Sequence, residues 1–154
     1  MIKTVKTART SNLKTKMINV LMRNGEKKTV EKILLKFLKF LQKSTNKRFK
    51  NLIQVAIINS TSTFKINEQI IKRGKRKSIR SIPSFITSDV LRVTNSFKLL
   101  RNVVFKTKNS NYFYKNLVNE FLASSQLKGQ SVEKKVETQK QILMNKRYLS
   151  KFRW

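Results

Sequence analysis

The sequence predicts a mainly α-helical fold: a single helical-bundle domain of about six helices, with one β-hairpin protruding at roughly residues 62–86. Over most of the chain, apolar residues recur every three or four positions, which is typical of helices that bury one face. Only around residues 64–70 do apolar and polar side chains alternate as they do in strands. The 154 residues hold no internal repeat, no long linker and one proline, so we expect one domain.

The first three predicted helices lie before residue 60. The clearest covers residues 29–41 and carries one apolar stripe, made of Val30, Ile33, Leu34, Phe37, Leu38 and Leu41. We expect Thr29 to be its N-cap, with Glu31 in the first turn. The pair Asn24-Gly25 predicts the turn that ends an earlier helix bearing Met17, Ile18, Leu21 and Met22. A third helix is indicated by Phe49, Leu52, Ile53, Ala56 and Ile57.

The predicted hairpin has a cationic tip. Its first strand carries Phe64, Ile66 and Ile70 in alternation with polar residues, and its second covers residues 79–86, including Pro83, which suits an edge strand. Between the strands, residues 72–77 place five basic side chains around one glycine. Because a two-stranded ribbon is marginal in water, we expect the body of the domain or RNA to hold it.

Helical spacing returns after the hairpin. Ser88 and Asp89 predict an N-cap and first turn for a helix whose apolar face is Val90, Val93, Phe97, Leu100 and Val104. The next helix carries Phe113, Leu117, Phe121 and Leu122, and we expect Gly129 to close it near its C-terminus. Ser131 is expected to cap a last helix whose stripe, Val132, Val136 and Leu143, is thin enough to indicate weak docking or a partner.

The net charge of the chain limits the classes of function that it can have. Lys and Arg number 36 against 7 Asp and Glu, a net charge of +29, so the natural partner is a polyanion: nucleic acid first, an anionic membrane surface second. A membrane span is not expected, because the most apolar stretch, residues 52–58, is interrupted by Gln54. The chain has no Cys and no His, and its one close acidic pair, Glu133 and Glu137, fits a solvated helix face. We therefore expect no catalytic residue, no metal site and no cofactor.

Besides the hairpin, basic residues cluster near both ends of the sequence. Residues 1–16 have the composition of a transit peptide or a nucleic-acid-binding arm; we favour an arm, at residues 1–12, before a domain at 13–154. At the C-terminus, cations alternate with Tyr148 and Phe152, which could stack on bases or pack on the helices. The predicted RNA-binding residues are Lys3, Lys6, Arg9, Lys14, Lys16, Lys27, Lys28, Lys72, Arg73, Lys75, Arg76, Lys77, Arg80, Lys134, Lys135, Lys146, Arg147, Lys151, Arg153 and Trp154.

Two separated motifs carry a resemblance to a known family. Residues 16–22 read K-M-I-N-V-L-M and residues 24–31 read N-G-E-K-K-T-V-E. Further on, residues 117–120 read L-V-N-E, residues 128–135 read K-G-Q-S-V-E-K-K, and residues 145–146 (N-K) and 152–154 (F-R-W) follow. This order and spacing resembles the small-subunit ribosomal protein seven family over residues 13–154. The hairpin tip departs from the family, which usually has a paired glycine beside two arginines there.

The resemblance implies a structural component of the small ribosomal subunit and not an enzyme. Family members bind the three-prime (head) domain of small-subunit rRNA and support head assembly and translation, with the hairpin near the mRNA exit and exit-site tRNA. The implied partners are therefore small-subunit rRNA, nearby mRNA and tRNA, and neighbouring ribosomal proteins, with no membrane and no small-molecule substrate.

Composition bears on the compartment and on alternatives. Abundant Lys, Asn, Ile and Phe indicate an AT-rich coding sequence, which favours a mitochondrial ribosome over a plastid or the bacterial cytoplasm. A general cationic DNA- or RNA-compacting protein is the alternative function, and it explains the charge but not the spaced motifs. A membrane-active cationic protein would need broader apolar helix faces than these.

Overall fold

The structure is a computed structural model that describes the backbone of residues 4–45, 49–73, 76–107 and 112–146. Within these ranges, the side chains of residues 4–12, 71, 73 and 76 are not described. The described elements are α1 (Thr4–Leu21), α2 (Lys27–Ser44), α3 (Phe49–Ser60), β1 (Phe64–Arg73), β2 (Arg76–Phe85), α4 (Asp89–Lys106), α5 (Phe113–Ser125) and α6 (Gln130–Met144). This confirms the predicted fold class, six helices and one antiparallel hairpin.

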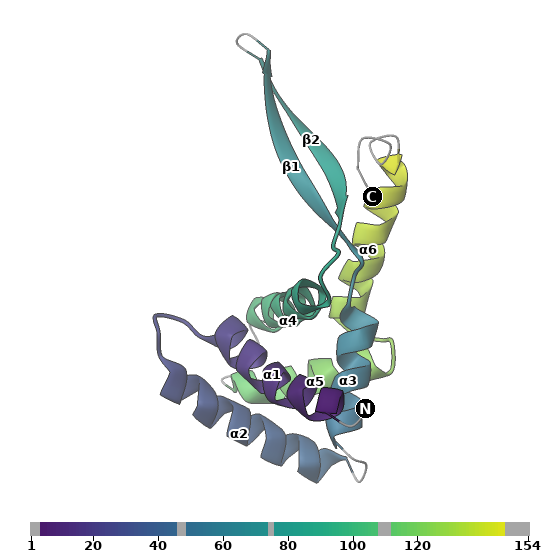
Figure 1. The fold of residues 1–154 in the computed structure, drawn as a ribbon. Coiled ribbons are helices and arrows are strands. Elements are labelled where there is room, and N and C mark those ends of the chain that lie inside the picture. Colours follow the sequence, from purple (N-terminus) through teal and green to yellow (C-terminus); the bar gives the residue numbers. More distant parts are fainter. Residues whose placement is uncertain (1–3, 46–48, 74–75, 108–111, 147–154) are drawn as a thin grey trace.

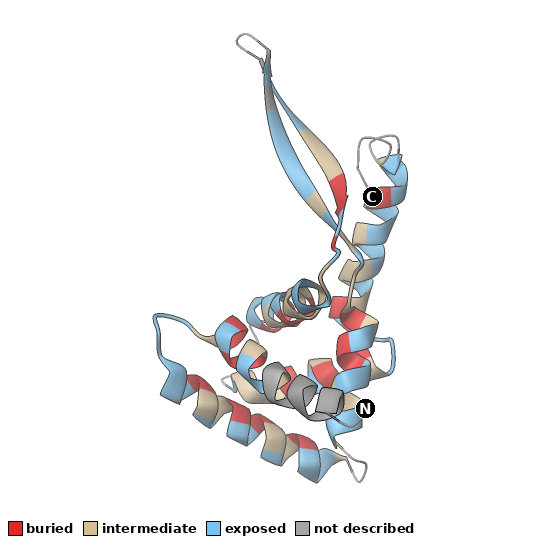
Figure 2. Ribbon diagram, in the orientation of Figure 1, coloured by how far each residue is buried: buried red, intermediate tan, exposed pale blue. Residues whose placement is uncertain are grey.

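The five helices α1 to α5 form a bundle, from which the hairpin and α6 project on one side (Figure 1). Helix α5 lies at the centre, since it contacts α2, α3, α4 and α6. Helix α6 contacts α3, α4, α5 and the first strand of the hairpin. The hairpin is therefore held at its base by the body, as expected, while its far half extends away from it (Figure 2).

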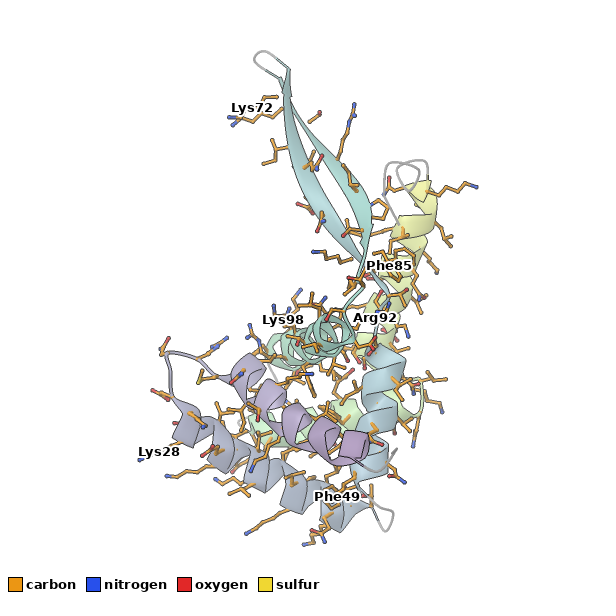
Figure 3. The ribbon with its side chains drawn as sticks, in the orientation of Figure 1. Lys28, Phe49, Lys72, Phe85, Arg92 and Lys98 are labelled. Carbon is orange, nitrogen blue, oxygen red and sulfur yellow. The ribbon has the colours of Figure 1, made fainter. Side chains whose placement is uncertain are left out.

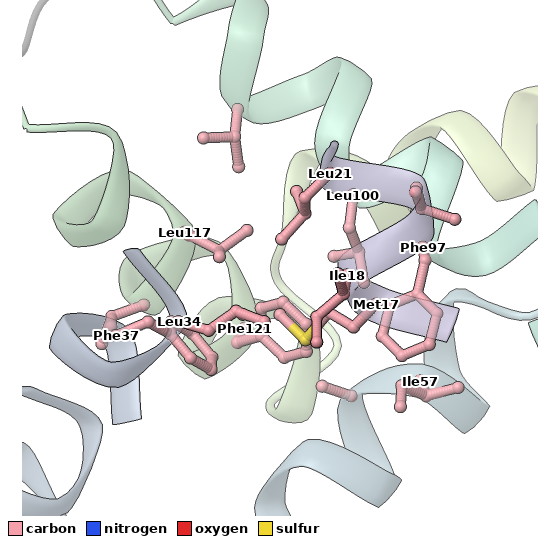
Figure 4. Close-up of a cluster of buried hydrophobic side chains, with 14 of the residues drawn as sticks. Met17, Ile18, Leu21, Leu34, Phe37, Ile57, Phe97, Leu100, Leu117 and Phe121 are labelled. Atoms are coloured by element: carbon pink, nitrogen blue, oxygen red, sulfur yellow. The ribbon is translucent and has the colours of Figure 1, made fainter. Parts of the chain in front are cut away.

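The core forms where the apolar stripes of the helices meet. In α2, Val30, Leu34, Phe37 and Leu41 are buried, as their spacing predicts. The Phe37 ring meets that of Phe121 in α5 edge to face, with centroids 5.2 Å apart, and both rings are fully buried (Figure 4). Removing either ring should cost about 3–5 kcal/mol of stability, because a large cavity would remain.

The turn between α1 and α2 forms as predicted, but the start of α2 does not. Asn24 (φ 51°) and Gly25 (φ 76°) both take the left-handed conformation that these two residue types tolerate best. Helix α2 then begins at Lys27 with Glu26 as its N-cap, so the prediction of Thr29 as the cap is wrong. The tight turn starts the helix before its first apolar residue, and the Thr29 hydroxyl instead donates to the Glu26 carboxylate at 3.2 Å.

The junction of α5 and α6 corrects two further predictions. Leu127 takes the left-handed position (φ 63°) after α5, and Lys128 N–H donates to Ala123 O at 2.9 Å, so Gly129 does not close this helix. Gly129 is instead the N-cap of α6, which moves the cap two residues upstream of Ser131. Ser131 is fully buried in the first turn of α6, where its hydroxyl lies 2.7 Å from that of Ser124.

Two apolar stripes are narrower than predicted. In α4, Phe97, Leu100 and Val104 are buried, but Val90 is 52% exposed because it precedes the part of the helix that packs on the core. The α6 stripe is largely exposed at Val136 and Leu143, and Ile142 is the buried apolar residue instead. Ser88 does occupy the N-cap position of α4, with Asp89 in the first turn.

Helix α1 begins at Thr4, so its backbone runs through most of the segment predicted to be an arm. The side chains of residues 4–12 lie outside the described part of the chain. Contact of this segment with RNA therefore stays a prediction.

Candidate nucleic-acid interface

Few cations of the described part of the chain are neutralised within it. Two ion pairs join described residues: Lys27 with Glu31 at 4.0 Å, and Arg92 with Asp89 at 3.4 Å. Seven acidic residues cannot balance 36 basic ones, and most of the charge is left on the surface. A folded chain with this imbalance repels itself, and a polyanion relieves the repulsion.

The hairpin concentrates this charge away from the body. Its register places Lys72 opposite Lys77 and Arg73 opposite Arg76, so like charges face each other across the ribbon. Directly opposed like charges destabilise a ribbon. Lys72 and Lys77 are exposed, and Figure 3 shows Lys72 far from the helices. The tip can therefore reach phosphates that the body cannot.

The predicted residues do not form a single patch. Lys27 and Lys28 lie at the start of α2, and Figure 3 places Lys28 at the opposite end of the molecule from Lys72. Lys14 is exposed on α1, while Lys16 is half-buried. RNA that contacts all of these residues would have to pass around the domain.

On α6, the predicted contacts differ in their surroundings. Lys146, just after the helix, is exposed, whereas Lys134 is half-buried. The Nζ of Lys135 donates a hydrogen bond to Asn59 O at 2.8 Å, which ties α6 to α3. Burial lowers the pKa of Lys135 because the charged form loses water. This ammonium thus already has a role inside the domain.

The side chains of ten predicted residues fall outside the described part: Lys3, Lys6, Arg9, Arg73, Lys75, Arg76, Arg147, Lys151, Arg153 and Trp154. The stacking or packing of Tyr148 and Phe152 lies outside it too. Contact of all these residues with RNA stays a prediction. Arg80, on the second strand, is described and is half-buried.

The structure also assembles a basic pocket that the sequence analysis missed. A cavity of about 360 Å³, which we call the Phe105 pocket, is lined by Arg23, Leu99, Arg101, Asn102, Phe105, Lys106 and Lys134. Arg101 and Phe105 are four residues apart and so share a face of α4, which is a signal that the sequence offers. Arg23 and Lys134 come from distant segments, and no local pattern brings them there.

Two other cavities show no catalytic chemistry. The larger of the two, about 710 Å³, lies between the hairpin base and α6, and its lining includes Ser60, Glu68 and Lys135. A second, about 440 Å³, is mostly apolar and lies between α1, α2 and α3. The described residues contain no cluster of three His, Cys, Asp or Glu side chains that could hold a metal ion.

None of the described helices combines the length and apolarity needed to cross a membrane. The arrangement can bind anions at several places, through lysine and arginine side chains on a helical scaffold and on its projecting ribbon. It is therefore the arrangement of a nucleic-acid-binding protein.

Comparison with known protein families identifies which nucleic-acid-binding family the chain belongs to. The family described as Ribosomal protein S7p/S5e matches residues 2–146, and the chain belongs to this family. The chain is accordingly a small-subunit ribosomal protein that binds rRNA and other ribosomal proteins and takes part in translation, a structural component and not an enzyme. The resemblance stated from the sequence is thus confirmed. No curated protein matches the chain.

Proposed function

We propose that this chain binds the three-prime domain of small-subunit rRNA and helps to assemble the head of the subunit. The observation that carries the proposal is the spread of cations: Lys72 on the hairpin and Lys28 on α2 lie at opposite ends of the molecule. Binding at separated points fixes the relative geometry of converging RNA helices. The function is therefore that of a scaffold whose affinity comes from phosphate neutralisation.

The hairpin is proposed to lie near the mRNA exit and the exit-site tRNA. Its support is the projection of the ribbon, whose far half carries exposed Ile70 and Ile79 as well as the cationic tip. Neighbouring ribosomal proteins are proposed to cover exposed apolar side chains on α6, where Leu143 is 68% and Met144 is 82% exposed. We place the chain in a mitochondrial ribosome on the strength of its composition, with plastids and the bacterial cytoplasm as alternatives.

Crosslinking in native extract at physiological salt, followed by sequencing of the bound nucleic acid, tests this proposal. The expected reads concentrate at one multi-helix junction in the three-prime domain of small-subunit rRNA. Reads scattered over DNA and unrelated RNA would instead support a general compacting protein. Fractionation of organelles in the same extract tests the compartment.

Substitution at the tip tests the hairpin separately. We expect Arg73→Glu combined with Arg76→Glu to weaken rRNA binding without unfolding the domain, because both residues lie at the end of the ribbon, far from the core. Filter binding and circular dichroism measure the two quantities. Unchanged affinity with an unchanged spectrum would refute the role of the tip.

A further inference from the structure

Arginine guanidinium groups lie over two of the described phenylalanine rings, Phe85 and Phe105, and the surroundings of the two rings differ. Arg92 lies over the ring of Phe85 with its guanidinium carbon 5.1 Å from the centroid, and Arg23 lies over Phe105 at 4.2 Å. Both rings are 39% exposed. Arg92 is neutralised locally, because it pairs with Asp89 and its Nε donates to Ile86 O at 2.7 Å. This first pair is explained by contacts within the fold.

The second pair has no such explanation among the described residues. No carboxylate of the described part lies within ion-pair distance of Arg23, and the Phe105 pocket beside it adds Arg101, Lys106 and Lys134 without any acid in its lining. Four cations around one cavity repel one another unless an anion enters. The pocket is therefore arranged for a negatively charged ligand.

Arg101 is fixed in place before any ligand arrives. Its Nη1 donates to Val20 O at the end of α1 at 2.8 Å, and its guanidinium carbon lies 5.8 Å from the Phe105 centroid. Its Nε is buried and has no hydrogen-bond partner in the described part of the chain. An unpartnered buried donor on a cation is costly, and nearby negative charge reduces that cost. Arg101 therefore supplies a fixed positive charge at the pocket, which favours an anion such as phosphate.

The ring adds a second element of recognition. Phe105 packs against Phe113 with centroids 4.8 Å apart, so both the ring and the guanidinium above it are held in position. The Arg23 guanidinium carbon lies 4.2 Å from the ring centroid, within cation–π distance, and Arg23 is an exposed residue that a ligand can reach. Guanidinium planes and aromatic rings are the surfaces on which unpaired bases stack. A paired base inside a duplex offers no such face.

We infer that the Phe105 pocket binds one unpaired nucleotide of RNA, with the phosphate among the four cations and the base on the Arg23–Phe105 stack. This inference rests on the proposed function, since it names what one part of the rRNA-binding surface recognises. It predicts a preference for single-stranded RNA at this place. The hairpin tip, which has cations without a described ring, would not share that preference.

The test compares a short oligoadenylate with an RNA duplex of the same length, by fluorescence anisotropy with the full chain at fixed salt. Phe105→Leu keeps an apolar side chain but removes the ring, and should weaken binding of the oligoadenylate by roughly 5- to 100-fold. Arg23→Lys keeps the charge but removes the plane, and should act in the same direction. Neither should change the affinity for the duplex. The matched control is Phe85→Leu, at an equally exposed ring under a neutralised arginine, which should change neither affinity.

Three results decide the matter. Selective loss of affinity for the oligoadenylate in both variants supports the inference. Equal loss for both RNAs, or no loss in Phe105→Leu with a native circular dichroism spectrum, overturns it, because the pocket would then bind backbone phosphate alone or nothing. If the wild-type chain also fails to bind small-subunit rRNA, the proposed function itself is refuted, which the other outcomes leave standing.

Discussion

Gly129 is expected to be the less replaceable of the two glycines in the described part of the chain, and Gly129→Ala tests how α5 and α6 are joined. A methyl group at this position would lie 2.7 Å from both Glu120 Oε1 and Ser124 Oγ, and 3.0 Å from the Ser124 backbone nitrogen. The side-chain atoms could move, but they already hold the junction together. Glu120 Oε1 accepts the Ser131 N–H at 2.8 Å, and Ser124 Oγ contacts the Ser131 hydroxyl.

The magnitude follows from these contacts. Crowding a packed interior costs about 1–3 kcal/mol. Loss of a hydrogen bond to a charged group, here Ser131 N–H to Glu120, adds about 1.5–3 kcal/mol if the carboxylate is displaced. Each kcal/mol lowers Tm by about 2–4 °C in a chain of this size. We therefore expect Gly129→Ala to lower Tm by roughly 2–24 °C, the upper end applying when both effects occur.

Urea unfolding followed by circular dichroism measures the effect, since the free energy of unfolding follows from the midpoint and slope. Gln130→Ala is the control, because Gln130 is the next residue, lies in the first turn of α6 and is exposed. It should leave the midpoint unchanged. If Gly129→Ala also left the midpoint unchanged, the close packing of α6 against Glu120 and Ser124 would be refuted.

The remaining predictions concern charge, core and backbone. Lys72→Glu with Lys77→Glu should weaken rRNA binding and reduce the salt dependence of the affinity, with a slope change of about 0.9 for each phosphate that the variant no longer neutralises, as filter binding over a salt series would measure. Phe121→Ala should lower the free energy of unfolding by about 3–5 kcal/mol in urea, because its buried ring fills the centre of the core. Leu127→Gly should raise the stability by up to about 1 kcal/mol in the same assay, because Leu127 holds a left-handed conformation and is exposed. Burial lowers the pKa of Lys135, so the unfolded chain keeps this proton to higher pH than the folded chain does. The stability of the wild-type chain relative to Lys135→Met should therefore rise as pH increases from the folded pKa of Lys135 toward its ordinary value. Urea midpoints at several alkaline pH values measure this difference.

Local periodicity was sufficient to predict most of the fold. The apolar stripe of α2 follows from the spacing of residues on successive helical turns, and its members Phe37 and Leu41 are buried as predicted. The turn at Asn24 and Gly25 also follows from local chemistry, since both residues tolerate positive φ.

Predictions failed where tertiary packing decided the local structure. Gly129 was expected to close α5 at its C-terminus, yet it is needed for the approach of α6 to Glu120, a contact between separate helices. Leu127, a poor residue for positive φ, occupies the position instead. The exposure of Val90 likewise depends on where the body of the domain ends.

In the candidate interface, too, features set by local sequence were predicted and features set by tertiary packing were not. Clustered charge in residues 72–77 is visible in the sequence and lies at the hairpin tip. The Phe105 pocket is not visible as a cluster, because Arg23, Phe105 and Lys134 belong to three different segments. The part of the Phe105 pocket that a local pattern indicates is the pair Arg101 and Phe105, which are spaced to share one helix face.

The opposed lysines of the hairpin give salt two contrary effects on this protein. In the free chain, added salt screens part of the repulsion between Lys72 and Lys77, more so as the Debye length falls below its value of about 8 Å at physiological ionic strength, and so favours a closed ribbon. In the complex, the same salt competes for the RNA phosphates and weakens binding. The paired ribbon is therefore least stable in the free chain at the low salt at which RNA binds most tightly. Since bound phosphates neutralise the same lysines, RNA binding offsets the repulsion that opposes strand pairing.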